Sequence, residues 1–196
     1  MLSRVSIGLP GAIDPTLVRQ LAPRIEALGF RALWLNDTRD GDSLAGLAVA
    51  ASVTSTLTLA TGVIPLDRRP ADTLVEPIRA LPAERLEVGI GSGGPRDALA
   101  RVRAGIDALR DATDATVLVG ALGPRMRALG AEHADGLLLN WLTPAAAADA
   151  TTLLKSVNAE GHAALYARTI LTEDARPALE DEAARYASYP TYAANL

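Results

Sequence analysis

The sequence predicts a single-domain α/β protein built around a parallel sheet. Apolar runs of strand length alternate with helix-like stretches along all 196 residues, and most of these runs end in Gly, Asp or Asn. Such alternation is typical of strands joined by crossover helices. Hydrophobic residues make up 49% of the chain, which is enough for one core, and the length suits one domain. Folds of this kind place their chemistry at the C-terminal ends of the strands.

Seven strand–helix units are expected in order along the chain. The apolar runs predict strands at Val5–Pro10, Ala32–Asn36, Leu57–Val63, Leu86–Ile90, Thr116–Ala121, Gly136–Asn140 and Ala163–Leu171. The stretches between and after them predict helices at Asp14–Leu28, Leu44–Ser55, Ala71–Leu81, Asp97–Asp111, Arg125–His133, Pro144–Val157 and Arg176–Ala187. The tail SYPTYAANL is expected to be irregular.

Capping residues and apolar spacing justify the helices. Asp14 is expected as the N-cap of the first helix, with Pro15 at its first position and Gly29 at its end. The third helix is weaker, because Pro77 interrupts it. The fourth helix carries apolar residues at helical spacing, namely Leu99, Val102, Ile106 and Leu109.

The pattern alone does not separate a closed barrel from an open sheet. A complete (β/α)₈ barrel usually needs roughly 250 residues, and this chain ends where an eighth strand would begin. A doubly wound open sheet shows the same alternation of strands and helices. From periodicity, both architectures remain open.

Composition excludes several classes of function. Without cysteine, there is no disulfide, thiolate metal site or cysteine nucleophile. The two histidines lie apart, His133 at a helix end and His162 in an expected turn, so we expect no metal site. A net charge of −4 without a basic stripe argues against nucleic acid. No apolar run reaches the ~18 residues of a membrane span, and the N-terminus lacks a secretory leader, so we expect a cytoplasmic protein.

The segment Gly120–Arg125 is the best candidate for an anion site. A strand runs into a glycine turn that opens a helix, and the backbone N–H groups there meet the positive end of the helix dipole. Arg125 adds a charge that suits a cofactor phosphate. A tight βα turn with an exposed arginine is the alternative. Gly91 and Ser92 begin a second glycine-rich turn, which is weaker evidence by itself.

Several long phrases of the sequence resemble the luciferase-like monooxygenase family. They include LWLNDTRDGDSLAGLAVAASVTSTLTLATGVIPLDRRP, LEVGIGSGG, VGALGPRM, HADGLLLNWLTP and YASYPTYAANL, in the family's order. The similarity is greatest to the branch that uses the deazaflavin coenzyme F420. The resemblance implies one TIM-type (β/α) barrel over residues 1–196, shortened to about seven strands. It also implies an oxidoreductase or monooxygenase with F420, or alternatively FMN, at the C-terminal face.

The resemblance also implies roles for particular residues. Asn36 and Asp37 end strand two, where the family faces the reactive ring, and they are the expected catalytic residues; a helix or turn cap is the alternative role for Asp37. Thr38 stands where a histidine is frequent. Thr61, Gly62, Val63 and Ile64 correspond to a bulge that backs the ring, with Gly62–Val63 as the expected cis peptide. Gly91 and Ser92 border the cofactor, and the loop Gly120, Ala121, Leu122, Gly123, Pro124, Arg125 holds its phosphate. Asn140 and Trp141 bring an amide and an indole to a strand tip, which suits contact with a ring or its tail.

Two departures from the family pattern affect function. The usual long insertion after strand four is absent, and the eighth strand and its helix are missing. These departures leave a second hypothesis open, a cofactor-binding barrel without turnover. A gap between strands one and seven would expose apolar edges, so we expect a homodimer that covers it, with a small-molecule substrate and no nucleic-acid or membrane partner. Arg68 and Arg69 either bind an anionic group or lie on a solvated loop.

Overall fold

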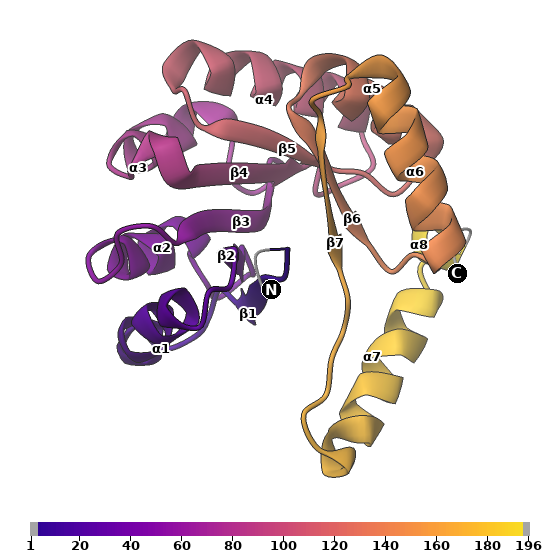
Figure 1. Cartoon of the computed structure of the whole chain (residues 1–196). Helices are drawn as coiled ribbons and strands as arrows, with labels where there is room; N and C mark the ends of the chain where they lie inside the picture. Colours follow the sequence, from indigo (N-terminus) through magenta and orange to yellow (C-terminus); the bar gives the residue numbers. More distant parts are fainter. Residues whose placement is uncertain (1–3, 194–196) are drawn as a thin grey trace.

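A computed structural model describes residues 4–193 of the chain, and its centre is one parallel sheet. Seven strands follow one another in chain order and curl into an incomplete barrel, with helices on its outer side (Figure 1). The strands are β1 (Ile7–Pro10), β2 (Ala32–Asn36), β3 (Thr58–Pro65), β4 (Leu86–Gly91), β5 (Thr116–Gly120), β6 (Gly136–Asn140) and β7 (His162–Tyr166). The expected shortened (β/α) barrel is therefore confirmed.

The helices follow the expected order. They are α1 (Pro15–Ala27), α2 (Ser43–Ala51), α3 (Val75–Arg79), α4 (Ala98–Ala112), α5 (Pro124–His133), α6 (Pro144–Val157), α7 (Arg176–Ala187) and α8 (Pro190–Ala193). Short 3₁₀ turns occupy Ala71–Leu74, Ala83–Arg85 and Glu173–Ala175. None of the helices in the described range is long and apolar enough to cross a bilayer.

Local signals account for the first and third helices. Asp14 caps α1 by accepting a 2.7 Å hydrogen bond from the backbone N–H of Thr16, as expected. Gly29 follows the helix with φ of +77°, a left-handed conformation that glycine adopts without steric cost. The expected helix at residues 71–81 is split into a 3₁₀ turn and the short α3, which contains Pro77.

Two apolar layers hold the barrel together. Alternate strand residues point outward, and the outer set, such as Leu33, Leu35 and Ile90, packs under the helices. The residues between them form a smaller interior cluster of Ala32, Trp34, Ala60, Leu118 and Leu138, with Val63, Ala164 and Tyr166 packed against it. Asn36, Gly120 and Asn140 each lie two residues beyond a member of that cluster, so alternation places them on the interior face at the C-terminal end.

The opposite end of the barrel is closed by charged residues. Glu87, at the start of β4, is buried and forms an ion pair with Arg31. His162 Nε2 lies 3.8 Å from Glu87 Oε2, and burial lowers the pKa of His162 although Glu87 opposes that effect. His162 is the first residue of β7, so its expected placement in a turn was wrong. β7 begins one residue before the expected Ala163 because Gly136 in β6 pairs with His162.

The C-terminal region differs most from expectation. The seventh strand ends at Tyr166 instead of Leu171, because β6, its partner, ends at Asn140 and offers no further pairing. Residues 167–172 then run away from the sheet to the 3₁₀ turn Glu173–Ala175 and to α7, forming an arm that projects beyond the strands (Figure 1). The tail contains the short helix α8 instead of being irregular throughout. Among residues 4–193, β1 and β7 do not pair, so the expected gap is present.

Candidate functional site

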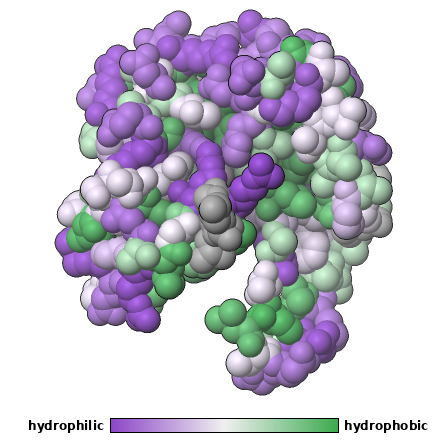
Figure 2. All heavy atoms as spheres, viewed as in Figure 1, coloured by the Kyte–Doolittle hydropathy of each residue, from purple (hydrophilic) through white to green (hydrophobic). Residues whose placement is uncertain are grey.

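The expected site residues lie at one end of the barrel. Because all seven strands are parallel, their C-terminal ends lie along the same rim. This rim carries Asn36 and Asp37 from β2, the segment Thr61–Ile64 from β3, Gly91 and Ser92 from β4, the loop Gly120–Arg125 after β5, and Asn140 and Trp141 from β6. Figure 2 shows a hollow between the N-terminal side of the molecule and the projecting arm that carries α7 (compare Figure 1). The structure thus brings the residues to one rim from five different strands.

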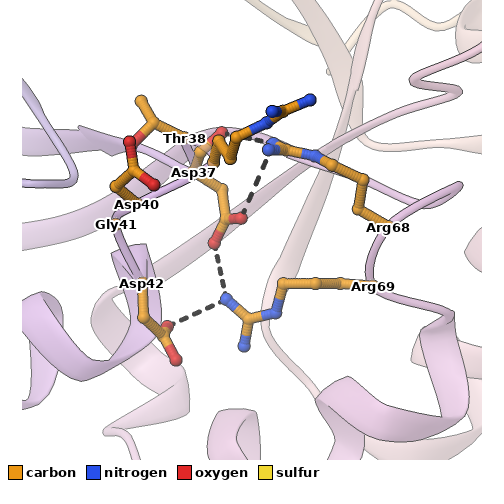
Figure 3. Close-up of a pocket in the computed structure, with 8 residues that line it drawn as sticks. Asp37, Thr38, Asp40, Gly41, Asp42, Arg68 and Arg69 are labelled. Carbon is orange, nitrogen blue, oxygen red and sulfur yellow. Dashed lines mark hydrogen bonds and ion pairs between the residues drawn. The ribbon is translucent and has the colours of Figure 1, made fainter.

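Asp37 is bound by the segments that surround it. Its Oδ2 accepts hydrogen bonds from Ser43 Oγ at 3.0 Å and from the Ser43 backbone N–H at 3.3 Å. The same carboxylate pairs with Arg69 at 2.5 Å (Figure 3). Its side chain is only 3% exposed. These contacts give Asp37 a capping role at the start of α2. A direct catalytic role for this carboxylate stays a prediction.

Arg68 and Arg69 lie over the end of β2. Arg68 donates a 2.9 Å hydrogen bond to the Asp37 carbonyl oxygen, and Arg69 also pairs with Asp42 at 2.8 Å (Figure 3). Burial of the Arg69 guanidinium acts to lower its pKa. The hydrogen bonds and charges of Asp42 and Asp37 outweigh this effect, so the pKa of Arg69 is raised. Both arginines and residues 37–42 line an open pocket of about 550 Å³. Arg68, with 40% of its side chain exposed, and the exposed Arg39 are the cations of this pocket that are accessible to an anionic ligand.

The end of β3 carries the expected bulge. The register between β3 and β4 shifts between Thr61 and Ile64, and the Gly62–Val63 peptide is cis, so both expectations are confirmed. Thr61 Oγ1 donates to the Gly89 carbonyl oxygen at 3.0 Å, which ties the bulge to β4. On the other side, the Asp37 backbone N–H donates to the Val63 carbonyl oxygen at 3.4 Å.

Two glycines on the rim make room for the bulge. A Cβ added at Gly91 or at Gly120 would lie 2.9 Å from a methyl group of Val63, closer than side chains normally approach. Larger residues at either strand end would therefore push Val63 out of place. Gly91 was expected to border the cofactor and Gly120 to belong to the phosphate loop, and the structure places both against the segment expected to back the ring.

The N-terminus of α5 presents open backbone. Gly123 is the N-cap residue and Pro124 the first helical residue, and no side chain caps this end within the described part of the chain. An added Cβ at Gly123 would meet nothing within 4 Å, and Arg125 is exposed. The first amides of a helix lack intrahelical acceptors and meet the positive end of its dipole. This loop therefore fits the expected phosphate site.

An aromatic group covers the end of β6. Trp141 has φ of +52°, which costs a non-glycine residue about 1 kcal/mol or more, and its ring lies 5.0 Å from that of Tyr186 on α7. The Arg168 guanidinium lies 5.4 Å from the Trp141 ring centre and pairs with Glu182 at 3.0 Å. Trp141 Nε1 and Asn140 Oδ1 are buried without a hydrogen-bond partner among residues 4–193. A donor and an acceptor are thus left unsatisfied at this strand tip.

Two residues of the rim were not expected from the sequence, Tyr166 and Arg168. Tyr166 ends β7 on the interior face, and its hydroxyl donates a 3.2 Å hydrogen bond to Asn36 Oδ1. The alternation of His162, Ala164 and Tyr166 was a signal that could have found it. Overextension of the seventh strand to Leu171 hid the fact that Tyr166 stands at a strand end.

A family model of luciferase-like monooxygenases matches residues 2–116. The chain belongs to the luciferase-like monooxygenase family. This confirms the resemblance drawn from the sequence phrases, and it agrees with the parallel barrel and the bulge at the end of β3. No curated protein sequence matches the chain.

Solved structures share the fold. The coenzyme F420-dependent tetrahydromethanopterin reductase from Methanopyrus kandleri is 19% identical, with a TM-score of 0.63 over 82% of this chain and 64% of that one. A monooxygenase from Streptomyces bottropensis is 18% identical, with a TM-score of 0.66 over 97% of this chain and 77% of that one. An F420-dependent secondary alcohol dehydrogenase, solved with an F420-acetone adduct, is 13% identical, with a TM-score of 0.64 over 82% and 68% of the two chains. At these identities the likeness shows the fold alone.

Within the described residues, the rim presents an open helix N-terminus and two unsatisfied polar side-chain atoms. The open N-terminus of α5 suits a phosphate, and the unsatisfied atoms of Asn140 and Trp141 suit the polar edge of a ring or its tail. No group of three metal-ligating side chains occurs within residues 4–193. The residues present therefore fit a phosphate-bearing planar cofactor.

Proposed function

We propose that this protein is an oxidoreductase that binds coenzyme F420, or alternatively FMN, at the C-terminal rim of its barrel. The observation that carries the proposal is the convergence of the β3 bulge, the open N-terminus of α5 and the unsatisfied polar atoms after β6 on that rim. When bound, such a cofactor supplies hydride transfer at its ring. Family membership and the F420-dependent neighbours support this choice.

The chain's own residues would bind and orient the reactants. Gly123 and Arg125 would hold the cofactor phosphate, and the Gly62–Val63 segment would back the ring. Asn36, on the interior face, would donate a hydrogen bond from Nδ2 to an oxygen of the ring or of a small-molecule substrate. The carbonyl oxygen of Asp37, which accepts a hydrogen bond from Arg68, would keep the Arg68 guanidinium at the mouth of the barrel. The aromatic group around Trp141 would exclude water from one side of the ring.

A cofactor-binding barrel without turnover is the second candidate. One observation favours it: Gly93 and Gly94 lead almost directly into α4 at Ala98, so the chain has no long segment after β4 to cover a substrate. Such a protein would hold the cofactor at the same residues. The two candidates differ in what happens after binding.

Titration followed by a reoxidation assay separates these candidates. The chain is titrated with F420 and, separately, with FMN, and the absorbance of the bound cofactor is recorded. The reduced complex is then mixed anaerobically with carbonyl acceptors, and in a parallel sample with oxygen. Substrate-dependent reoxidation is expected of the oxidoreductase. Binding without any reoxidation would favour the second candidate, and absence of binding by either cofactor would contradict both.

We also propose that two copies of the chain associate across the open side of the barrel. Leu171, on the arm, is 96% exposed and Leu165, on the edge strand β7, is 47% exposed. Figure 2 shows apolar surface on the arm facing the hollow. Apolar surface beside an unpaired strand edge is typical of an interface, and dimers are the commonest closed assembly.

A further inference from the structure

Tyr166 lies across the mouth of the barrel and contacts three other strands. A Cβ added at Gly8 in β1 would lie 2.7 Å from the Tyr166 ring, and one added at Gly62 in β3 would lie 2.6 Å from its hydroxyl oxygen. The Trp34 ring of β2 meets the Tyr166 ring edge to face, with centres 6.0 Å apart at 79°. One side chain of the last strand therefore spans the side of the barrel where β1 and β7 do not pair.

The ring of Tyr166 is held from both sides. Trp34 packs against it from inside the barrel, and the Arg168 guanidinium lies 5.8 Å from its ring centre. Arg168 is in turn held by Glu182 on α7 at 3.0 Å. The glycines at positions 8 and 62 leave the room that this ring fills. The position of the hydroxyl group is consequently fixed by packing.

The hydroxyl group fixes the orientation of Asn36. It donates to Asn36 Oδ1 at 3.2 Å, so Nδ2 is the end of that amide which serves other partners. Burial raises the pKa of Tyr166, which keeps the hydroxyl protonated and a donor at every physiological pH. Asn36 and the bulge at Gly62 both belong to the site proposed above, and Tyr166 touches both.

We propose that Tyr166 is a positioning residue of this site. It closes the mouth on the open side of the barrel and orients the Asn36 amide so that Nδ2 donates to an oxygen of the bound ligand. The ligand class that this arrangement recognises is a planar heterocycle or substrate with a carbonyl oxygen. The inference rests on the proposed function for the identity of the ligand, whereas the orientation of Asn36 is a property of the chain itself.

A variant series tests the link between the two residues. Tyr166→Phe keeps the ring and removes the hydroxyl group, Asn36→Ala removes its acceptor, and the double variant removes both. Binding is measured with the cofactor that the wild type binds, F420 or FMN. Tyr166→Phe is expected to raise its Kd about fivefold to tenfold. The double variant is expected to bind no more weakly than Asn36→Ala alone, because the hydroxyl acts through Asn36. Asn158→Ala, which removes an amide at the C-terminus of α6, at the opposite end of the barrel from the rim, is the control and should bind as the wild type does.

A measurement without cofactor keeps the two proposals distinguishable. The side-chain amide signals of Asn36 in an ¹H–¹⁵N spectrum are expected to shift in Tyr166→Phe, while those of Asn158 stay in place. Unchanged Asn36 signals would overturn the positioning role, whether or not a cofactor binds. Additive effects of the two substitutions on Kd, or tighter binding by Tyr166→Ala, would also overturn it, the latter because the ring would then occupy the ligand's own space. Failure of the wild type to bind either cofactor, with the amide shift present, would contradict only the proposed function.

Discussion

Gly123, at the N-terminus of α5, allows a test of the phosphate site that separates binding from folding. Its backbone angles, φ −89° and ψ 161°, are accessible to any L-residue, and an added Cβ meets no described atom within 4 Å. An aspartate at this position would accept hydrogen bonds from the first turn of the helix and complement its dipole. Together these effects stabilise a helix by about 0.5–1 kcal/mol. Gly123→Asp is therefore expected to preserve or raise the free energy of unfolding.

The same carboxylate would repel a phosphate bound to α5. Two unit charges about 4 Å apart interact by about 1 kcal/mol in bulk water and about 4 kcal/mol at an effective dielectric constant of about 20. Gly123 is half-buried on an open loop, so the lower part of this range applies. We expect a loss of about 1.5 kcal/mol, which is about tenfold in Kd. Gly123→Asn caps the helix in a similar way without the charge and is the matched control.

The assay combines thermal unfolding with cofactor titration at low and high salt. Both variants should unfold at or above the wild-type temperature. The aspartate variant should bind the cofactor about tenfold more weakly than the asparagine variant at low salt, and the difference should shrink as salt screens the repulsion. Equal affinity of the two variants, with folding intact, would refute the assignment of the phosphate to this helix.

Two further predictions concern stability and assembly. Burial opposes the ionisation of Glu26, but hydrogen bonds from the backbone N–H groups of residues 55–57 prevail and lower its pKa to about 2. Because this pKa lies below the ordinary glutamate value of 4.5, the stabilisation is present above pH 4.5 and is lost as the pH falls toward 2. Glu26→Gln is expected to lower the free energy of unfolding at pH 7 by about 1 kcal/mol, and this difference from the wild type should vanish in acid. Denaturant titrations at pH 7 and pH 2 measure the difference. An equal difference at both pH values would contradict the prediction. Leu171→Glu is expected to shift the chain from dimer to monomer in light scattering. The control is Leu28→Glu, at an exposed leucine that follows α1, and it should leave the dimer in place. A monomeric wild type would contradict the proposed dimer.

Local sequence signals predicted most of the fold because they act within a few residues. Asp14 and Gly29 bound α1 as expected, since capping and left-handed termination depend on neighbouring backbone. The β2 and β6 boundaries were predicted correctly for a similar reason, as turn residues follow each apolar run. The bulge at Thr61–Ile64 came from the family resemblance and not from a local signal.

Features that depend on tertiary contacts were harder to predict. The extent of β7 is set by where β6 ends, so the apolar residues Ala167, Ile170 and Leu171 gave a misleading strand signal. The Asp37 carboxylate accepts a hydrogen bond from Ser43 and pairs with Arg69, which lies 32 residues further along the chain. No sequence spacing rule predicts these contacts. Alternation along β7 placed Tyr166 on the interior face, but its contact with Asn36 depends on β7 ending there, which only the tertiary structure shows.

A crystal structure of the chain with the cofactor that it binds would test the central claim most directly. The phosphate is expected on the backbone N–H groups at the N-terminus of α5, near Arg125, and the ring is expected against the Gly62–Val63 segment with Asn36 within hydrogen-bond distance of one of its oxygens. A cofactor bound elsewhere on the surface, or at the rim with its phosphate away from α5, would contradict the account.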